Sequence, residues 1–181
     1  MNAKELKTRS KFLSLVLRHK PESIDLILDE NGWVEVATLL EKSGKHGVNI
    51  TPENLVLIVE TNDKKRFSFS SDKTKIRANQ GHSIDVDLQL SAAIPPALLF
   101  HGTATKNIDS IKENGLTKGN RHHVHLSSDE ETAMSVGRRY GKPVLVRIDT
   151  EKMLAEGFEF FRSENGVWLV DHVPAVFIRF E

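Results

Sequence analysis

Residues 14–21 read SLVLRHKP, an apolar run that ends in three basic residues and a proline. This run closes a longer segment, 3–18, in which apolar side chains form one broad helical face and the lysines lie mostly off it. Proline has no amide hydrogen for a helix interior, so we expect the helix to end just before Pro21. The sequence therefore predicts a helix over 3–18 that delivers Arg18 and His19 at its end.

Length and composition limit the class of protein. The chain has 181 residues, of which 39% are hydrophobic and 28% charged, as in a globular domain or two small lobes. Its 25 basic and 25 acidic side chains cancel, so any basic surface must be local. The chain contains no cysteine, which removes disulfide frameworks and cysteine-rich zinc sites. We see neither a signal peptide nor an apolar run of ~18 residues, and expect a cytoplasmic protein with no membrane partner.

The first half is predicted to combine helices with a terminal hairpin. Segment 37–42 has a helical pattern, and Thr51 and Pro52 are typical of the start of the next helix, which runs to residue 60. Segments 67–70 and 74–77 read as the two strands of a hairpin with a short loop. Helices followed by such a hairpin indicate a winged-helix-like lobe, and a small α+β lobe without that topology is the simpler alternative.

Residues 84–97, which include two consecutive prolines, are predicted to be a connector, and most of the apolar segments after them have a strand-like pattern. Strands are expected over 98–100, 144–146, 158–161, 167–170 and 176–178. Helices are expected over 105–114, ended by Gly115, and over 129–140, capped by Ser127 or Ser128. The overall prediction is an α+β chain with lobes over 1–90 and 91–181.

Three basic clusters are candidates for binding an anion: Arg18-His19, the segment 63–67 (DKKRF) and the segment 137–140 (GRRY). Each has a simpler explanation. Basic residues in the last turn of a helix interact favourably with its dipole, and charged loops are usually just solvated.

Two histidine-containing segments are further candidates. His101-Gly102-Thr103 follows an apolar strand and precedes a helix, where glycine would let a ligand approach the backbone. The segment 122–125 (HHVH) could hold a metal, but it lacks a nearby acidic or cysteine ligand, and a surface loop or a nucleotide contact is preferred. We find no G-x-G-x-x-G, P-loop, G-x-S-x-G or H-E-x-x-H motif.

Six strings taken together go beyond what periodicity can establish. They are SKFLSLVLRH (10–19), DKKRF (63–67), IRANQGHS (76–83), FHGT (100–103), HVHLS (123–127) and NGVWL (165–169). Their types and order resemble the RNA 2′-phosphotransferase family, in its bacterial KptA branch, over nearly the whole chain. The R-A-x-Q-G-H-S string is the most specific of them.

This resemblance implies a winged-helix-like RNA-binding lobe followed by a strand-rich lobe of the ADP-ribosyltransferase type. It implies an enzyme that transfers an internal RNA 2′-phosphate, of the kind left by tRNA splicing, to NAD+ through an ADP-ribosylated phosphate. The products would be RNA with a 2′-hydroxyl, nicotinamide and ADP-ribose 1″,2″-cyclic phosphate. The family's essential Arg-His-Arg-Arg set matches Arg18, His19, Arg66 and Arg139, and its G-x-R pattern favours Arg139 over Arg138.

The NAD+ side is expected to use histidines, small residues and backbone groups of the second lobe: His101, Gly102, Thr103, Gly115, Leu116, His125 and Ser127. NAD+ would be a co-substrate, with no metal, and the partner an RNA carrying a 2′-phosphate, bound by a monomer. The glutamate of protein-modifying relatives has no counterpart, because Val167 and Trp168 stand in that region. Two rivals stay open: an ADP-ribosyltransferase acting on RNA 5′-phosphate ends or another acceptor, and a non-catalytic winged-helix regulator that binds nucleic acid.

Overall fold

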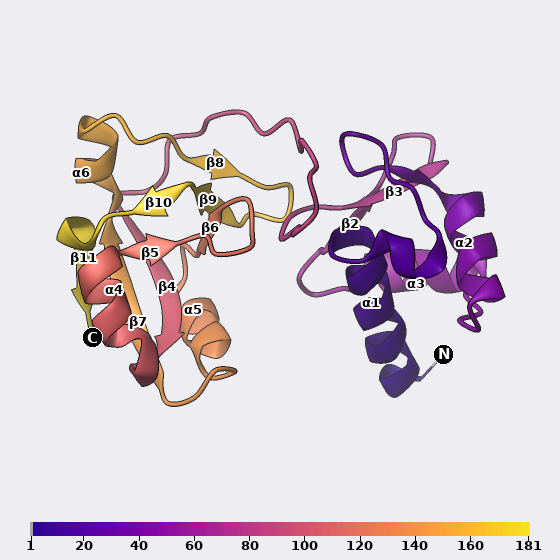
Figure 1. Ribbon diagram of the computed structural model, residues 1–181, viewed down its shortest axis with the longest axis horizontal. Coiled ribbons are helices and arrows are strands. Elements are labelled where there is room, and N and C mark those ends of the chain that lie inside the picture. Colours follow the sequence, from indigo (N-terminus) through magenta and orange to yellow (C-terminus); the bar gives the residue numbers. More distant parts are fainter. Residues whose placement is uncertain (1) are drawn as a thin grey trace. The chain divides into compact units, whose positions relative to one another are not determined.

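A computed structural model describes residues 2–181, which divide into two compact units, residues 2–89 and Leu90–Glu181 (Figure 1). Each unit has helices, strands and a hydrophobic core of its own. The predicted α+β class is confirmed at this level. Among the described residues, no helix combines the length and the apolar character that crossing a bilayer requires.

Helix α1 (Ala3–Arg18) organises the first unit and confirms the predicted helix. It begins with a capping box, in which the Asn2 side chain accepts from the Glu5 amide and the Glu5 carboxylate accepts from the Asn2 amide, both at 2.9 Å. Leu13, Val16 and Leu17 are fully buried on its inner face. The helix ends at Arg18, with His19 as its C-cap, before a 3-10 turn, η1 (Pro21–Ile24).

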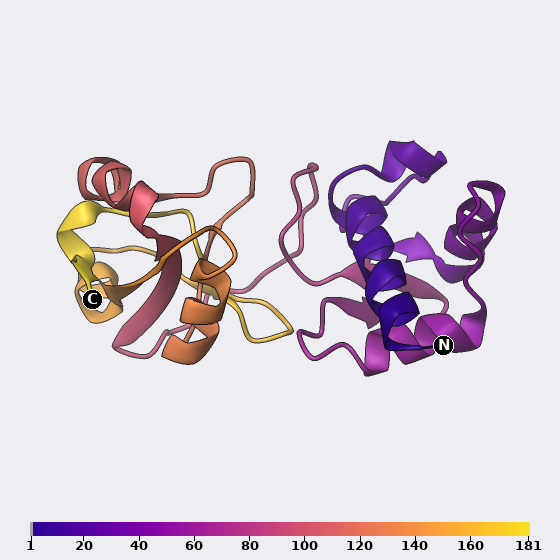
Figure 2. The same cartoon turned by 90° about the horizontal axis from the view of Figure 1, so that it is seen from below.

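Two further helices and a small sheet complete this unit. Helix α2 (Val36–Lys45) is longer than predicted, and α3 (Pro52–Glu60) has Thr51 as its cap, as predicted. Strands β1 (Val34–Glu35), β2 (Phe67–Phe69) and β3 (Lys75–Ala78) form an antiparallel sheet in the order β1-β3-β2. The predicted hairpin is thus present, with its return strand starting one residue later. Both views show α1 beside this sheet, where it packs against β3 (Figures 1 and 2).

The second unit contains three small antiparallel sheets, ordered β11-β7-β4, β6-β9-β8 and β10-β5. Its elements are β4 (Leu98–Ala104), η2 (Thr105–Asn107), α4 (Ile108–Asn114), β5 (Leu116–Thr117), β6 (Val124–Leu126), α5 (Glu130–Gly137), β7 (Pro143–Asp149), α6 (Thr150–Ala155), β8 (Phe161–Arg162), β9 (Trp168–Val170), β10 (His172–Val173), η3 (Ala175–Phe177) and β11 (Ile178–Phe180). A bridge between Phe100 and Ser127 connects β4 to the end of β6.

Helix α5 lies directly on β4, and two glycines permit this contact. A Cβ placed on Gly102 would stand 1.6 Å from the Ala133 carbonyl oxygen, and one on Gly137 would stand 2.7 Å from the Thr103 carbonyl oxygen. The strand predicted over 98–100 extends further, because His101, Gly102 and Thr103 continue strand β4 to Ala104. The glycine at 102 admits a helix backbone, which a strand pattern read alone does not reveal.

Other boundaries also differ from the predictions. Helix α5 is shorter than 129–140, and its cap is Asp129, whose carboxylate accepts from the Thr132 amide at 2.7 Å, rather than Ser127 or Ser128. The strand expected over 176–178 starts only at Ile178, because η3 forms directly after Pro174. The strand expected over 158–161 is reduced to β8.

Candidate functional site

Arg18 is the last residue of α1, and its side chain is buried, with 9% of its surface exposed. Its guanidinium donates from Nη2 to the backbone carbonyl of Arg66 at 3.3 Å and lies 5.8 Å from the centre of the Phe67 ring. Burying a guanidinium is costly unless hydrogen bonds compensate it. The contact between the Arg18 guanidinium and the start of β2 is therefore part of the fold. It does more than place a positive charge at the negative end of the helix dipole.

His19 is exposed and is held by Ser83. Its Nδ1 lies 2.9 Å from the Ser83 hydroxyl, and the Ser83 amide donates to the Arg18 carbonyl at 2.9 Å. Two bonds from one serine therefore tie the end of α1 to residue 83. Ser83 is the last residue of the IRANQGHS string (76–83), and these two bonds give it a physical role that the sequence alone does not show.

Arg66 is positioned by Asn62 and by a tight turn. Its Nη1 donates to the Asn62 Oδ1 at 3.1 Å, and the same oxygen accepts from the Lys64 amide at 3.2 Å. Lys65 has a φ of +39°, a backbone conformation that is rare for a residue with a side chain. Asn79 holds this turn, because its Nδ2 donates to the Lys65 carbonyl at 2.7 Å and its amide to the Arg66 carbonyl at 2.9 Å.

The structure thus brings three of the predicted residues, Arg18, His19 and Arg66, into one hydrogen-bonded network of the first unit. Two arginines and a histidine so arranged are suited to an anion, since a guanidinium offers several donors in a fixed geometry. Sequence reasoning missed the residues that position them, Asn62 and Asn79. Asparagine favours such local backbone bonds, but its presence in a loop does not say which carbonyl it reaches.

The fourth predicted residue, Arg139, lies in the second unit. It follows α5, its amide donates to the Val136 carbonyl at 3.2 Å, and its side chain is exposed. Arg138, its neighbour, is also exposed and caps the same helix.

His101, His125 and Ser127 come together in the second unit. The Nδ1 of His101 lies 3.0 Å from the His125 carbonyl, which can only accept, so the ring carries its proton on Nδ1. Burial lowers the pKa of His101, and the ring is neutral with Nε2 as an acceptor. The amide and carbonyl of Ser127 both pair with Phe100 at 2.8 Å, which sets this segment beside the strand of His101.

The remaining predicted residues serve packing. Thr103 is buried, and its hydroxyl accepts from the Asn107 Nδ2 at 3.1 Å. Gly115 ends α4 with a φ of +71°, where a Cβ would stand 2.1 Å from the Val173 carbonyl oxygen, and Leu116 belongs to the core. Gly102 and Gly115 are both required by close backbone approach.

The histidine segment 122–125 is not gathered around a common point. His123 packs against the Phe161 ring, with centroids 5.6 Å apart, and burial lowers its pKa, with His122 adding to the effect. Within residues 2–181, no three or more His, Cys, Asp or Glu side chains form a cluster suited to a metal ion.

The chain matches the family model described as RNA 2′-phosphotransferase, Tpt1 / KptA family, over residues 4–172. A protein from Fusobacterium nucleatum named "Probable RNA 2'-phosphotransferase" is 56% identical over 171 residues, which cover 94% of this chain and 96% of that protein. Proteins with the same name from Pseudomonas fluorescens and Flavobacterium johnsoniae are 53% and 52% identical, covering 99% and 100% of both chains. The chain therefore belongs to the RNA 2′-phosphotransferase, Tpt1 / KptA family.

Proposed function

We propose that this chain is an NAD+-dependent RNA 2′-phosphotransferase, in which Arg18, His19, Arg66 and Arg139 bind the 2′-phosphate. The first unit would be the winged-helix-like RNA lobe, and the second the ADP-ribosyltransferase-type lobe that binds NAD+. The observation that carries the proposal is the hydrogen-bonded network that holds Arg18 and Arg66 together in a chain of this family.

The arginines would act as a clamp for a phosphate monoester. Such a group carries close to two negative charges at neutral pH and has three acceptor oxygens. Arginine stays protonated and can donate two parallel hydrogen bonds to one phosphate. Because the backbone around Arg66 is fixed by Asn62 and Asn79, its guanidinium would need little reorganisation on binding.

In the first step a phosphate oxygen forms a bond to the ribose carbon that carries nicotinamide, and nicotinamide leaves. The nucleophile is already anionic, so no general base is required. The region where related protein-modifying enzymes carry a glutamate offers no base here. Trp168 stands in that region, is buried and pairs with Leu126 in a sheet. Positioning of the phosphate is what the protein must contribute.

In the second step the neighbouring ribose hydroxyl attacks phosphorus, and the RNA leaves with a free 2′-hydroxyl. Negative charge grows on the phosphoryl oxygens, and donors that are already in place stabilise it. His19 would transfer the proton from the attacking hydroxyl to the leaving oxygen, since an imidazole nitrogen can both accept and donate a proton. Its Nδ1 lies 2.9 Å from the Ser83 hydroxyl, and we assign Nε2 to the phosphate.

The NAD+ contacts are assigned to the groups whose geometry fits them. His101 is neutral, with its Nδ1 proton held by the His125 carbonyl, and its Nε2 suits a ribose hydroxyl donor. The Ser127 hydroxyl, which donates to the Asp129 carbonyl at 2.9 Å, can accept from the same ribose. Gly102, Thr103, Gly115 and Leu116 would shape this site through the packing described above.

The test is product analysis after mixing the chain, NAD+ and a short RNA with one internal 2′-phosphate. The proposal requires ADP-ribose cyclic phosphate and 2′-hydroxyl RNA, detected by mass spectrometry. Arg18→Ala and Arg66→Ala should abolish both while the circular dichroism spectrum stays that of the parent. Arg179→Ala, which removes an exposed arginine on β11, is the matched control and should keep full turnover.

An RNA with a 5′-phosphate and no 2′-phosphate separates the enzymatic rival. If only that RNA becomes ADP-ribosylated, the chain is a transferase for another acceptor. If neither RNA reacts and RNA binding is independent of NAD+, the hypothesis of a non-catalytic winged-helix regulator replaces the proposal.

A further inference from the structure

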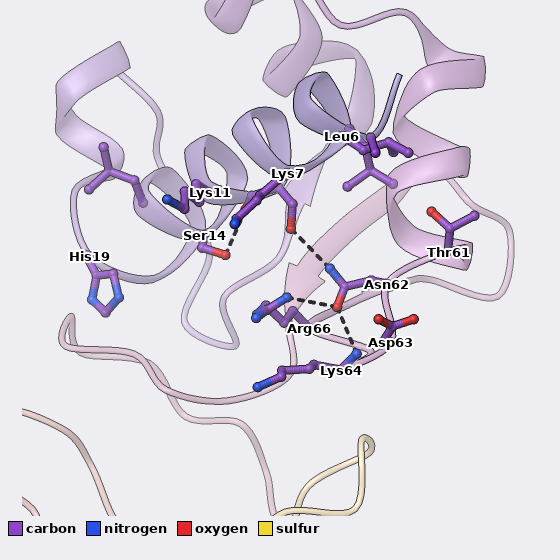
Figure 3. A pocket seen from close by; sticks show the side chains of 14 residues that line it. Leu6, Lys7, Lys11, Ser14, His19, Thr61, Asn62, Asp63, Lys64 and Arg66 are labelled. Carbon is purple, nitrogen blue, oxygen red and sulfur yellow. Dashed lines mark hydrogen bonds between the residues drawn. The ribbon is translucent and has the colours of Figure 1, made fainter. Parts of the chain in front are cut away.

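A groove of about 660 Å³ runs along α1 in the first unit, and it is larger than one phosphate needs (Figure 3). One side is formed by α1 from Ala3 to His19, and the other by the end of α3 and the loop 61–66. We call the hydrogen-bonded set of Arg18, His19 and Arg66 the anion network, and His19 and Arg66 of this set both line the groove. We call it the α1 groove.

Positive charge extends along the α1 groove well beyond the anion network. Lys7, Lys11, Ser14 and Arg18 follow the spacing i, i+4, i+7 and i+11, which places them on one helical face. The rise of about 1.5 Å per residue sets Lys7 about 16 Å from Arg18 along the axis. Figure 3 shows Lys7, Lys11 and Ser14 along α1.

The opposite side adds Lys64, and Asp63 is the single acidic residue that lines the groove within the described chain. Asn62 joins the two sides, because its Nδ2 donates to the Ser10 hydroxyl at 3.1 Å while its Oδ1 accepts from Arg66. The groove is thus held in shape by a bond from the loop to the helix.

Apolar side chains lie between the charges. Leu6, Leu15 and Ile58 line the groove, and Leu15 is 41% exposed although it is a large hydrophobic residue. A ligand that presents anionic groups along one edge and apolar faces along the other would satisfy both features. A single small anion would use neither the length of the charged row nor the apolar surface.

We propose that the α1 groove binds the single-stranded RNA that flanks the 2′-phosphate, with Lys7 and Lys11 contacting successive backbone phosphates. This inference rests on the proposed function, which sets the 2′-phosphate at Arg18, His19 and Arg66. Proteins that bind single strands combine a basic groove with surfaces for the bases. A volume in the range of small-ligand sites admits a few nucleotides of one strand and no duplex.

The salt dependence of RNA binding tests this inference. Fluorescence anisotropy without NAD+ gives the affinity for a labelled ten-nucleotide RNA, with one central 2′-phosphate, over a range of salt concentrations. Each lost phosphate contact makes the plot of log K against log salt shallower by about 0.7 for a single strand. The double variant Lys7→Gln/Lys11→Gln should therefore lower the slope by about 1.4 and weaken binding irrespective of base sequence.

The variant Lys42→Gln/Lys45→Gln is the matched control, because it removes two lysines from α2 that do not line the groove. It should keep the parent slope. Glutamine is a good helix former, so neither variant should disturb its helix. An unchanged slope for the Lys7/Lys11 variant, or an equal decrease for the control, would overturn the inference.

Turnover of a dinucleotide with one 2′-phosphate separates this inference from the proposed function. That substrate has no flanking strand to reach Lys7 and Lys11, so the Lys7/Lys11 variant should process it at the parent rate. A parent enzyme that produces no ADP-ribose cyclic phosphate from any RNA would refute the proposed function, whereas parent activity with an unchanged salt slope would refute only the groove.

Discussion

The guanidinium of Arg18 reaches the backbone carbonyl of Arg66 at 3.3 Å, which joins the end of α1 to the residue before β2. Neighbouring bonds connect the same two places to the segment 79–83, through Asn79 and Ser83. Positions far apart in sequence are thus held to each other largely by side chains that donate to backbone carbonyls. The clamp proposed for the 2′-phosphate would be assembled by the fold before RNA arrives.

Asn79 is expected to be essential for the geometry around Arg66. Asn79→Ala removes the bond from this buried side chain to the Lys65 carbonyl, and the lost hydrogen bond should cost about 0.5–1.5 kcal/mol of unfolding free energy. The loosened turn should also lower kcat/KM for a 2′-phosphorylated RNA. Urea denaturation and steady-state kinetics measure the two effects.

Lys65→Gly is the control for that change. Its φ of +39° is accessible to glycine without a steric penalty, so the variant should match or exceed the parent's stability and keep its activity. A large loss of activity in Lys65→Gly would assign importance to the lysine side chain, and an Asn79→Ala variant with parent kinetics would refute the positioning role.

Arg139 and Arg138 form a matched pair, since both are exposed and adjacent at the end of α5. Arg139→Ala should lower kcat by about 10²–10³, the effect typical of removing one donor to a developing oxyanion. Arg138→Ala removes the same positive charge, and its kcat should stay close to that of the parent. Single-turnover assays on 2′-phosphorylated RNA distinguish them, and the opposite order of effects would move the fourth clamp position to residue 138.

The elements that local chemistry determines could be predicted from the sequence. Helix α1 has an amphipathic pattern and a proline after its end, and Thr51 and Gly115 mark helix termini by their own preferences. The hairpin of β2 and β3 follows from alternation and a polar turn, where bonds from Ser70 and Thr74 lower the pKa of Asp72 to about 2.

Features that depend on partners distant in sequence could not be predicted. The sequence pattern predicts that Gly102 admits a ligand, because its actual neighbour in space, Ala133, comes thirty-one positions later in the sequence. Asn62, Asn79 and Ser83 read as ordinary polar loop residues until the carbonyls and rings that they contact are in place. The resemblance supplied Arg18, His19 and Arg66, and the network explains physically why the first unit holds them together.

Gly102 should tolerate no side chain. In Gly102→Ala the new Cβ would stand 1.6 Å from the Ala133 carbonyl oxygen, so α5 must move away from β4. We expect a loss of about 3 kcal/mol or more in unfolding free energy, as for severe overpacking. Thermal unfolding followed by circular dichroism measures it.

Gly44→Ala provides the comparison for this substitution. Gly44 lies inside α2, where a Cβ would meet only the Asn49 side-chain oxygen at 3.4 Å. Alanine is the better helix former, by about 0.5–1 kcal/mol, so this variant should be at least as stable as the parent. Equal destabilisation by both substitutions would show that the α5–β4 contact is not the cause.

His101 should make the stability of the protein dependent on pH. Burial lowers its pKa in the folded state, so the unfolded chain takes up the proton at a higher pH than the folded chain does. The contribution of His101 to stability is therefore complete above its ordinary pKa of about 6.5 and is lost as the pH falls through that value toward the lowered pKa. His101→Asn keeps a donor for the His125 carbonyl but cannot titrate. Its unfolding free energy should therefore decline less than the parent's between about pH 8 and about pH 5.5, which bracket the ordinary pKa. Urea denaturation at both pH values measures the difference, and parallel curves for parent and variant would show that the buried ring does not titrate in this window.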